Sequence, residues 1–307
     1  MATAHETPGR EGYLRLPAGW KRGSADGPGR FVTCEVFRLP DGSQVRWESR
    51  THRKRRSRAP RSGRGSLWWR PRQLSWWMAV LFAVGALCFA AGGVASQWAS
   101  TSRPAIGVMF FVGSLLFTAA AYLQYSQTVN VDRDPTGTRR SRWRPASWEP
   151  KRIDWLAALV QLIGTVLFNI STFAAMNTAL STHQIDARVW APDAFGSIAF
   201  LVSSELAFAE VCHRWFCFRR RSLPWKIVAL NLLGSIAFGI SAVASLVEPS
   251  SGEPLSAHLA NAGTSVGAVC FLLGALLLMP EAANREHAVS DDSRQAASPP
   301  PAARLIT

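Results

Sequence analysis

Six long apolar runs constrain what this chain can fold into more than any other feature. Each run holds about 19 or more mostly apolar residues, the length that a helix needs to cross the ~30 Å hydrocarbon core of a bilayer. The runs cover residues 75–97, 105–126, 154–178, 194–212, 226–247 and 260–279. The sequence therefore predicts an all-α integral membrane protein with six transmembrane helices.

The net charge of +14 is distributed unevenly among the segments that join these runs. Ten basic residues lie between Arg50 and Arg72, seven in segment 128–152 and five in segment 213–226, whereas the alternate loops hold only Arg103 and Arg188. Such alternation is the positive-inside pattern of membrane proteins. It predicts that both termini lie in the cytoplasm and that the basic loops attract anionic lipid. Nucleic acid is the weaker explanation of the charge.

The first helix of each predicted pair carries the same spaced residues. A Trp is followed by Gly nine positions later and by Phe four positions after that. At ~1.5 Å per residue the Gly lies ~13.5 Å beyond the Trp, so a Trp at the lipid headgroups places the Gly near the bilayer midplane. We expect the Trp to face lipid as an interface anchor and the Gly and Phe to share a helix-packing face. The three sets are Trp76, Gly85, Phe89; Trp155, Gly164, Phe168; and Trp225, Gly234, Phe238.

The second helices repeat a shorter version of this pattern, Gly followed by Phe four residues later. It occurs at Gly113 and Phe117, Gly196 and Phe200, and Gly267 and Phe271. Because each unit holds two helices, every copy enters and leaves the membrane on one side. The sequence predicts three parallel two-helix repeats that are related to one another by an axis along the membrane normal.

The remaining segments are predicted to be cytoplasmic. Two β-prone stretches flank Pro40-Asp-Gly-Ser43 and predict a small β-hairpin at 31–48. Since a lone hairpin is marginal in water, it is expected to need support from the membrane surface, from another chain, or from Tyr13, Leu16 and Trp20. The residues from Ser49 onward are expected to be a flexible polybasic linker. The predicted organisation is a cytoplasmic segment 1–60, a basic linker 61–74, membrane hairpins 75–127, 154–212 and 226–280, basic loops 128–153 and 213–225, and a disordered tail 281–307.

Polar residues within membrane helices are candidate functional groups because burying them in hydrocarbon is costly. Glu205 lies near the middle of the fourth run and Gln161 falls at about the same depth in the third, so the two are expected to pair. By the same count Asn169 is expected to face Ser197. Glu205, Gln161 and Asn169 are either an ion- or substrate-binding site or hydrogen-bonding contacts that hold helices together. Glu210 and His213 fall at the cytoplasmic interface, where side chains reach water.

The sequence predicts neither an enzyme nor a cofactor. Ser203 and Ser204 have no His at their depth, and phosphate-binding and zinc-protease motifs are missing. The five cysteines imply no disulfide framework. Cys212, His213 and Cys217 cluster in sequence, but their spacing matches no standard zinc site, so no metal is expected.

The first hairpin resembles the YrhK-like family of small, uncharacterised bacterial membrane domains. The resemblance is carried by Trp-Trp-Met-Ala-Val-Leu-Phe-Ala-Val-Gly-Ala-Leu-Cys-Phe at 76–89 and Phe-Phe-Val-Gly-Ser-Leu-Leu-Phe at 110–117. It implies a two-helix membrane unit and brings no catalytic or binding residues.

Three functions fit these expectations. The first is a non-enzymatic inner (plasma) membrane protein that acts as a structural, lipid-contacting or partner-binding element. The second is a small proton- or cation-coupled transporter or channel that uses Glu205. The third is a membrane sensor whose cytoplasmic N-terminal region binds a partner. The sequence itself names no substrate or partner.

Overall fold

The computed structural model describes residues 12–55, 68–97, 102–135, 143–248 and 252–297. The chain is mostly helical, and six helices in the described part are long and apolar enough to cross a membrane. The long helices are α2 Leu74–Ala95, α3 Arg103–Val129, α4 Ile153–Ala175, α6 Ala191–Cys212, α7 Leu223–Ala244 and α8 Ala257–Ala297. Prolines in the first turn begin α3, α6 and α7, where the missing N–H costs nothing.

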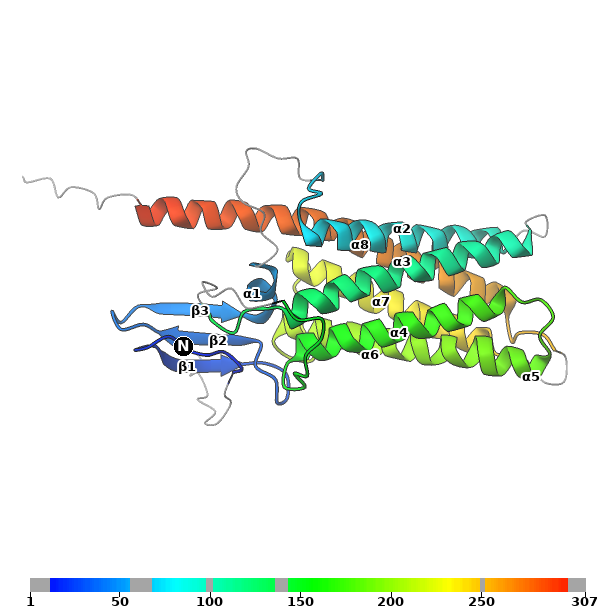
Figure 1. Cartoon of the computed structure of the whole chain (residues 1–307), viewed down its shortest axis with the longest axis horizontal. Coiled ribbons are helices and arrows are strands. Elements are labelled where there is room, and N and C mark those ends of the chain that lie inside the picture. The colour runs from blue at the N-terminus through cyan, green and yellow to red at the C-terminus, as the bar shows by residue number, and fades with distance from the viewer. Residues whose placement is uncertain (1–11, 56–67, 98–101, 136–142, 249–251, 298–307) are drawn as a thin grey trace, which may run out of the picture.

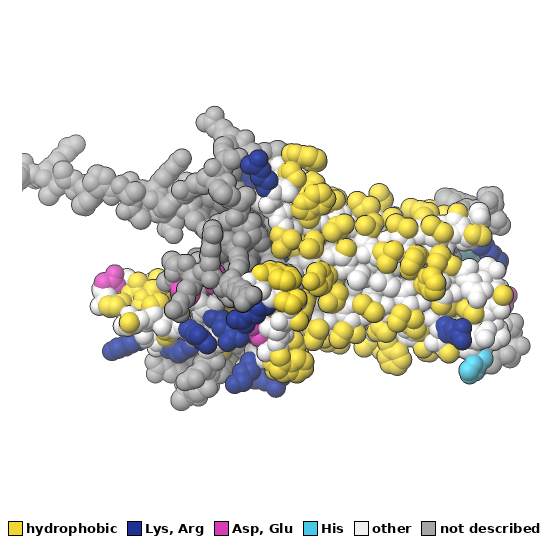
Figure 2. All heavy atoms as spheres, in the orientation of Figure 1, with side chains coloured by type: hydrophobic (Ala, Val, Ile, Leu, Met, Phe, Trp, Pro, Cys, Tyr) yellow, Lys and Arg dark blue, Asp and Glu magenta, His cyan; other side chains and the backbone are white. Residues whose placement is uncertain are grey.

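The six long helices form a closed ring in chain order. Each packs against the helix before and after it, and α8 closes the ring against α2 (Figure 1). The loop between α4 and α6 contains two short elements, α5 Thr182–Ile185 and a π-helical turn at Asp186–Trp190. Apolar side chains cover the sides of the bundle, and Lys and Arg side chains gather where the small sheet meets it (Figure 2).

Glycines let the paired helices approach closely at three places. A methyl group placed on Gly85 would lie 3.0 Å from the carbonyl oxygen of Gly113, and one on Gly164 would lie 3.2 Å from that of Gly196. The same holds for Gly234 against Gly267, at 3.0 Å. Backbones this close leave no room for a side chain.

Six phenylalanines fill the centre of the ring. Phe89, Phe168 and Phe238 lie with centroids 5.8–6.3 Å apart. Phe117, Phe200 and Phe271, from the other three helices, lie 5.8–6.4 Å apart. Pairs within each hairpin are 5.1–5.6 Å apart, so the two triangles of rings are in contact. This cluster seals the middle of the bundle with apolar rings.

The N-terminal unit, residues 12–55, lies at one end of the bundle, which we call the sheet end (Figure 1). Its antiparallel sheet has the order β1-β2-β3, with β1 Lys21–Asp26, β2 Cys34–Arg38 and β3 Gln44–Glu48. The predicted hairpin corresponds to β2 and β3, and β1 was not predicted. Tyr13, Leu16 and Trp20 pack against the sheet core of Leu14, Phe37 and Trp47.

Two predicted irregular segments are helical instead. Residues Ser49–Arg55 form α1, not a flexible linker, because their side chains find partners on the bundle. The rest of the polybasic run, through residue 67, lies outside the described residues. Helix α8 continues through Pro280 to Ala297, so much of the predicted disordered tail is helical, in keeping with the high helix propensity of its alanines.

The three anchor tryptophans share a contact that the sequence analysis missed. The indole N–H of each donates to a carbonyl eight residues earlier: Trp76 to Trp68, Trp155 to Ser147 and Trp225 to Cys217, at 2.7–3.0 Å. Each ring also meets an aromatic ring seven residues earlier. Trp155 is only 1% exposed and does not face outward as expected, since its ring packs among α3 and α4 residues.

Candidate functional site

Three carboxylates are buried at the sheet end, each on a different helix. Asp154 begins α4, Glu210 lies in the last turn of α6 and Glu281 lies on α8, all at most 3% exposed. A buried carboxylate needs a cation or several hydrogen bonds to remain charged. The partners come from α1 and, for Asp154, also from Arg152 just before α4.

Helix α1 supplies those cations from one short helical face. Arg53 donates to both oxygens of Glu210 at 2.9 and 3.0 Å and lies 2.9 Å from Asp154 Oδ2. Arg50 donates to Glu281 at 3.2 and 3.3 Å, and Lys54 pairs with the same carboxylate. Positions 50, 53 and 54 share one face of a helix, so α1 meets three bundle helices at once.

The network continues into the segment that joins α3 and α4. Arg152 bridges Asp154 at 2.6 Å and Glu149 at 2.8 Å, and the ring of Tyr13 lies 4.6 Å below its guanidinium group. Burial acts to lower the pKa of Arg53 and Arg152, but the neighbouring carboxylates outweigh it and raise both pKa values. Both guanidinium groups therefore stay charged.

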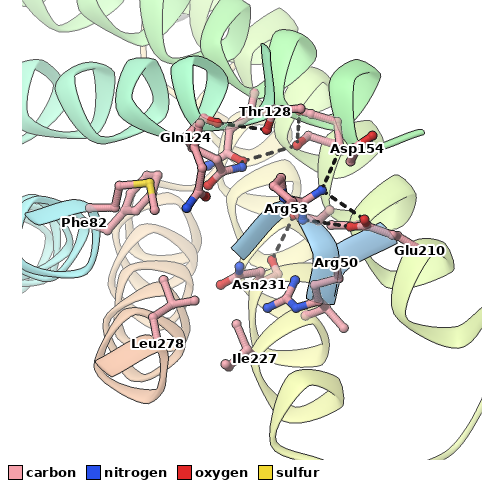
Figure 3. A pocket seen from close by; sticks show the side chains of 18 of the residues that line it. Arg50, Arg53, Phe82, Gln124, Thr128, Asp154, Glu210, Ile227, Asn231 and Leu278 are labelled. Atoms are coloured by element: carbon pink, nitrogen blue, oxygen red, sulfur yellow. Dashed lines mark hydrogen bonds and ion pairs between the residues drawn. The ribbon is translucent and has the colours of Figure 1, made fainter. Parts of the chain in front are cut away.

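A cavity of about 90 Å³ lies between α1 and the bundle (Figure 3). It has room for several water molecules, since one water needs ~10–15 Å³ of such space. Arg50, Arg53 and Lys54 line it from α1, and amide and hydroxyl side chains line it from four bundle helices: Gln124, Gln161, Ser203, Ser204 and Asn231. The cavity therefore has the ion pairs of Arg53 with Asp154 and Glu210 on one side and neutral hydrogen-bonding groups on the other, among apolar side chains that include Phe200 and Phe271 of the phenylalanine cluster.

Gln161 lies in this cavity, whereas Glu205 does not line it. Gln161 Oε1 accepts from Gln124 Nε2 at 3.0 Å and from Ser203 at 3.5 Å, so the expected pair with Glu205 is not formed. Counting residues along a helix gives the depth of a side chain in the bundle but not the direction in which it points around the helix axis. Ser203 and Ser204 point inward, and Glu205 is turned ~100° further round α6. Within the described residues it makes no hydrogen bond or ion pair.

Asn169 also faces a different neighbour from the one expected. Its Nδ2 donates to Thr118 on α3 at 2.9 Å, while Ser197 donates to the carbonyl of Phe238 on α7 at 3.5 Å. Both residues bond across the seams between hairpins. The pairing by depth assumed that each helix faces only its hairpin partner, but each helix in a closed ring has two neighbours.

The end of α6 differs from the sequence expectation in two respects. Glu210 and His213 do not reach water; they are 2% and 8% exposed beneath the N-terminal unit. Cys212 and Cys217 are joined by a disulfide, their Cα atoms 5.5 Å apart, although no disulfide was predicted. The tight turn after α6 brings the two together, within the usual Cα range for a disulfide.

The sequence contained a signal for the ion-pair network that was not used. Asp154 and Glu210 each lie at the basic end of an apolar run, where an acid beside arginines indicates a pairing site; Glu281 follows the last apolar run, in a segment of mixed charge. Comparison of the chain with family models, curated proteins and solved structures finds no match in any of the three. The resemblance to the YrhK-like family stays a prediction.

Proposed function

We propose that this protein is a non-enzymatic, multi-pass protein of the inner (plasma) membrane and acts as a sensor. Its N-terminal unit closes the cavity at the sheet end, and binding of a partner or ligand to that unit changes how α1 sits on the bundle. The charge distribution supports a cytoplasmic sheet end, with the basic loops against anionic lipid. The Gly contacts and the two Phe triangles support three parallel two-helix repeats.

The observation that carries this proposal is the set of buried ion pairs between α1 and three helices. Arg53 is 9% exposed and Glu210 is 2% exposed, and the two lie 157 residues apart in the chain. Buried ion pairs add little net stability compared with apolar packing, and their best-attested roles are in fixing a register or in switching. Since α1 is only seven residues long, these ion pairs supply most of its polar contacts with the described bundle helices, beside the contact of His52 with the carbonyl oxygen of Asp132.

The two other functions receive less support from the geometry. Transport through Glu205 needs a pathway that includes this residue, but the cavity excludes it and the phenylalanine cluster closes the centre. A purely structural protein has no need of a charged, removable cover over this cavity.

The proposal is tested by the reactivity of a thiol placed in the cavity. Ser204→Cys is introduced into a chain whose own cysteines are replaced by Ser, and labelling by a membrane-impermeant maleimide is followed in inside-out vesicles. Labelling should be slow with Arg53 present and about tenfold faster or more with Arg53→Ala. Each ~1.4 kcal/mol by which the docked state is destabilised raises the ratio of undocked to docked molecules tenfold. Arg133→Ala, which removes a half-exposed cation, is the matched control.

Equal labelling rates in the two backgrounds would show that the N-terminal unit does not control the cavity. Fast labelling in right-side-out vesicles, with none in inside-out vesicles, would place the sheet end outside the cell and overturn the orientation. A thiol at Ser181, at the opposite end of the bundle, reports that the vesicles are oriented as intended.

A further inference from the structure

Three potential metal ligands meet where the sheet covers the end of α6. One ligand atom from each of Cys34, Glu48 and His213 lies within 4.8 Å of the others. Cys34 and Glu48 are directly opposite each other in the β2–β3 ladder, so their side chains share one face of the sheet. His213 comes from the first residue after α6. The cluster is separate from the cavity beneath α1.

The backbone at His213 is unusual for its residue type. Its φ of 58° and ψ of 15° put it in the left-handed region, and no other non-glycine residue of the described chain has a positive φ. This position at a helix end is normally taken by Gly or Asn. The strained conformation turns the imidazole of His213 beneath the sheet, where it is 8% exposed.

Thr33 fixes which nitrogen of His213 can bind a metal. Its hydroxyl lies 2.9 Å from His213 Nδ1 and 3.4 Å from the carbonyl oxygen of Asp26. The hydroxyl therefore occupies Nδ1, and Nε2 is the ring nitrogen left for a metal. In the tautomer that binds a metal, Nδ1–H donates to the Thr33 hydroxyl and Nε2 carries the lone pair. Metal-binding histidines commonly have their other ring nitrogen held in this way.

The other two ligands fit the same chemistry. Cys34 is a free thiol, 6% exposed, and Glu48 is held by a hydrogen bond of 3.3 Å from Thr51. One sulfur, one nitrogen and one carboxylate oxygen are ligands of Zn²⁺, which takes three protein ligands and an open fourth position in many sites. Arg46 opposes this use, because its Nε lies 3.2 Å from Glu48 Oε1 and competes for the carboxylate.

We propose that Cys34, Glu48 and His213 bind a divalent transition-metal ion, Zn²⁺ above all, and that the ion ties the sheet to the end of α6. The fourth position is left to water. Binding replaces the thiol proton of Cys34 by the metal, and that proton passes to solvent. The metal site stands independently of the sensor proposal, although a bound ion would also hold the N-terminal unit on the bundle.

The experiment uses the full chain in lipid nanodiscs, freed of metal by a chelator and then titrated with Zn²⁺ in a calorimeter and with Co²⁺ in a spectrophotometer. Co²⁺ bound to a thiolate gives a charge-transfer band that Co²⁺ bound only to N and O lacks. The wild type should bind one ion per chain and show this band. Cys34→Ser should abolish the band, and His213→Ala should weaken Zn²⁺ binding by at least about 10-fold.

Matched variants separate the site from its surroundings. Cys270→Ser and His258→Ala change the same residue types elsewhere and should leave affinity unchanged. The double variant Cys212→Ser, Cys217→Ser should keep the band, because these sulfurs are not among the ligands. Arg46→Ala should tighten binding by freeing Glu48. If Cys34→Ser fails to fold, Thr33→Ala, which removes only the support of His213, should still weaken binding about 10- to 100-fold.

Several outcomes would overturn the proposal. One is a wild type that binds no metal. Another is a cobalt band that survives Cys34→Ser but is lost in the double cysteine variant, which would assign the metal to Cys212 and Cys217. Unchanged affinity for Zn²⁺ in both His213→Ala and Thr33→Ala would show that the imidazole of His213 is not a ligand. None of these outcomes bears on the thiol-labelling test, so failure of the metal site and failure of the sensor function are distinguishable.

Discussion

At the scale of single residues, Arg53 is the cation that pairs with buried Glu210, and it shares buried Asp154 with Arg152. It contacts both Glu210 and Asp154 at 2.9 Å. Removing one partner of a buried ion pair destabilises a protein far more than replacing both partners with apolar residues, because the remaining charge stays buried and unpaired. Loss of Arg53 would therefore leave Glu210 buried without its cation.

We expect Arg53→Ala to lower the free energy of unfolding of the N-terminal unit by about 3–5 kcal/mol. Replacing both partners, Arg53→Met with Glu210→Met, should recover much of the loss, since Asp154 keeps its pair with Arg152 and no unpaired charge is left buried. Arg133→Ala, whose side chain is 42% exposed, should cost less than about 1 kcal/mol. Hydrogen exchange of residues 12–55 in nanodiscs measures each value, and an Arg53→Ala loss no larger than that of Arg133→Ala would contradict the assignment.

Glu149 should give the sheet end a dependence on acid. Burial alone would raise its pKa, but the hydrogen bond and charge of Arg152 outweigh burial, and the pKa is lowered from its ordinary value. A carboxylate with a lowered folded pKa contributes stability that is present above the unfolded pKa of ~4.3 and is lost as pH falls through the lowered value. Thermal melts below pH 5 should therefore fall less steeply in Glu149→Gln than in wild type. Melting temperatures that fall equally with pH in both proteins would show that Glu149 does not contribute to the acid dependence.

At the scale of elements, the helices are held by close backbone contact at three glycine pairs. A methyl group on Gly234 would lie 3.0 Å from the Gly267 carbonyl oxygen and 3.2 Å from Phe271 Cδ2, whereas one on Gly239 meets nothing within 4 Å. The two positions are on the same helix and differ only in the face they occupy. Alanine substitutions at these two positions therefore compare the effect of helix–helix packing with the effect of helix propensity.

Gly234→Ala should destabilise the bundle by about 1–3 kcal/mol, because α7 and α8 must separate to admit the methyl group. Gly239→Ala should be neutral or stabilising, since it adds helix propensity without a clash. Thermal unfolding in detergent, followed by circular dichroism, separates the two variants. Equal melting temperatures would show that the close approach at Gly234 contributes nothing.

The sequence predicted the helices and their polar residues much better than it predicted which residues meet. Apolar length predicted the six long helices, and spacing singled out glycines and phenylalanines that the structure places at helix contacts. It failed for Glu205 and Gln161 because equal depth leaves the rotation of each helix undetermined. It failed for α1 because a seven-residue segment with four basic side chains forms a stable helix only when buried carboxylates distant in the chain supply partners.

At the scale of the whole molecule, two features disagree about the compartment of the sheet end. The basic segments argue for the cytoplasm, whereas the Cys212–Cys217 disulfide is typical of an oxidising compartment. The charge bias is present in three separate segments, whereas the disulfide lies in a single turn, so we propose that the sheet end lies in the cytoplasm. There the two cysteines would be held as thiols by the cellular reductants.

Alkaline phosphatase fusions test this orientation, because that enzyme is active only after export. A fusion after Leu180, in the loop between α4 and α6, should be active, and fusions after Arg221 and at the end of the chain should be inactive. Fluorescent-protein fusions at the same points should give the opposite pattern. The reverse of both patterns would place the N-terminal unit outside and would favour an intact disulfide.

The central claim is that buried charges hold the N-terminal unit on a six-helix bundle from which it can be released. The most direct measurement is a distance between spin labels at Val45 on β3 and Leu259 on α8, both at least 39% exposed, by double electron–electron resonance in nanodiscs. The account predicts one narrow distribution in the wild type and an additional, broader population in Arg53→Ala, with the bundle still folded. A single unchanged distribution in Arg53→Ala would show that these charges do not hold the unit in place, and would contradict the account.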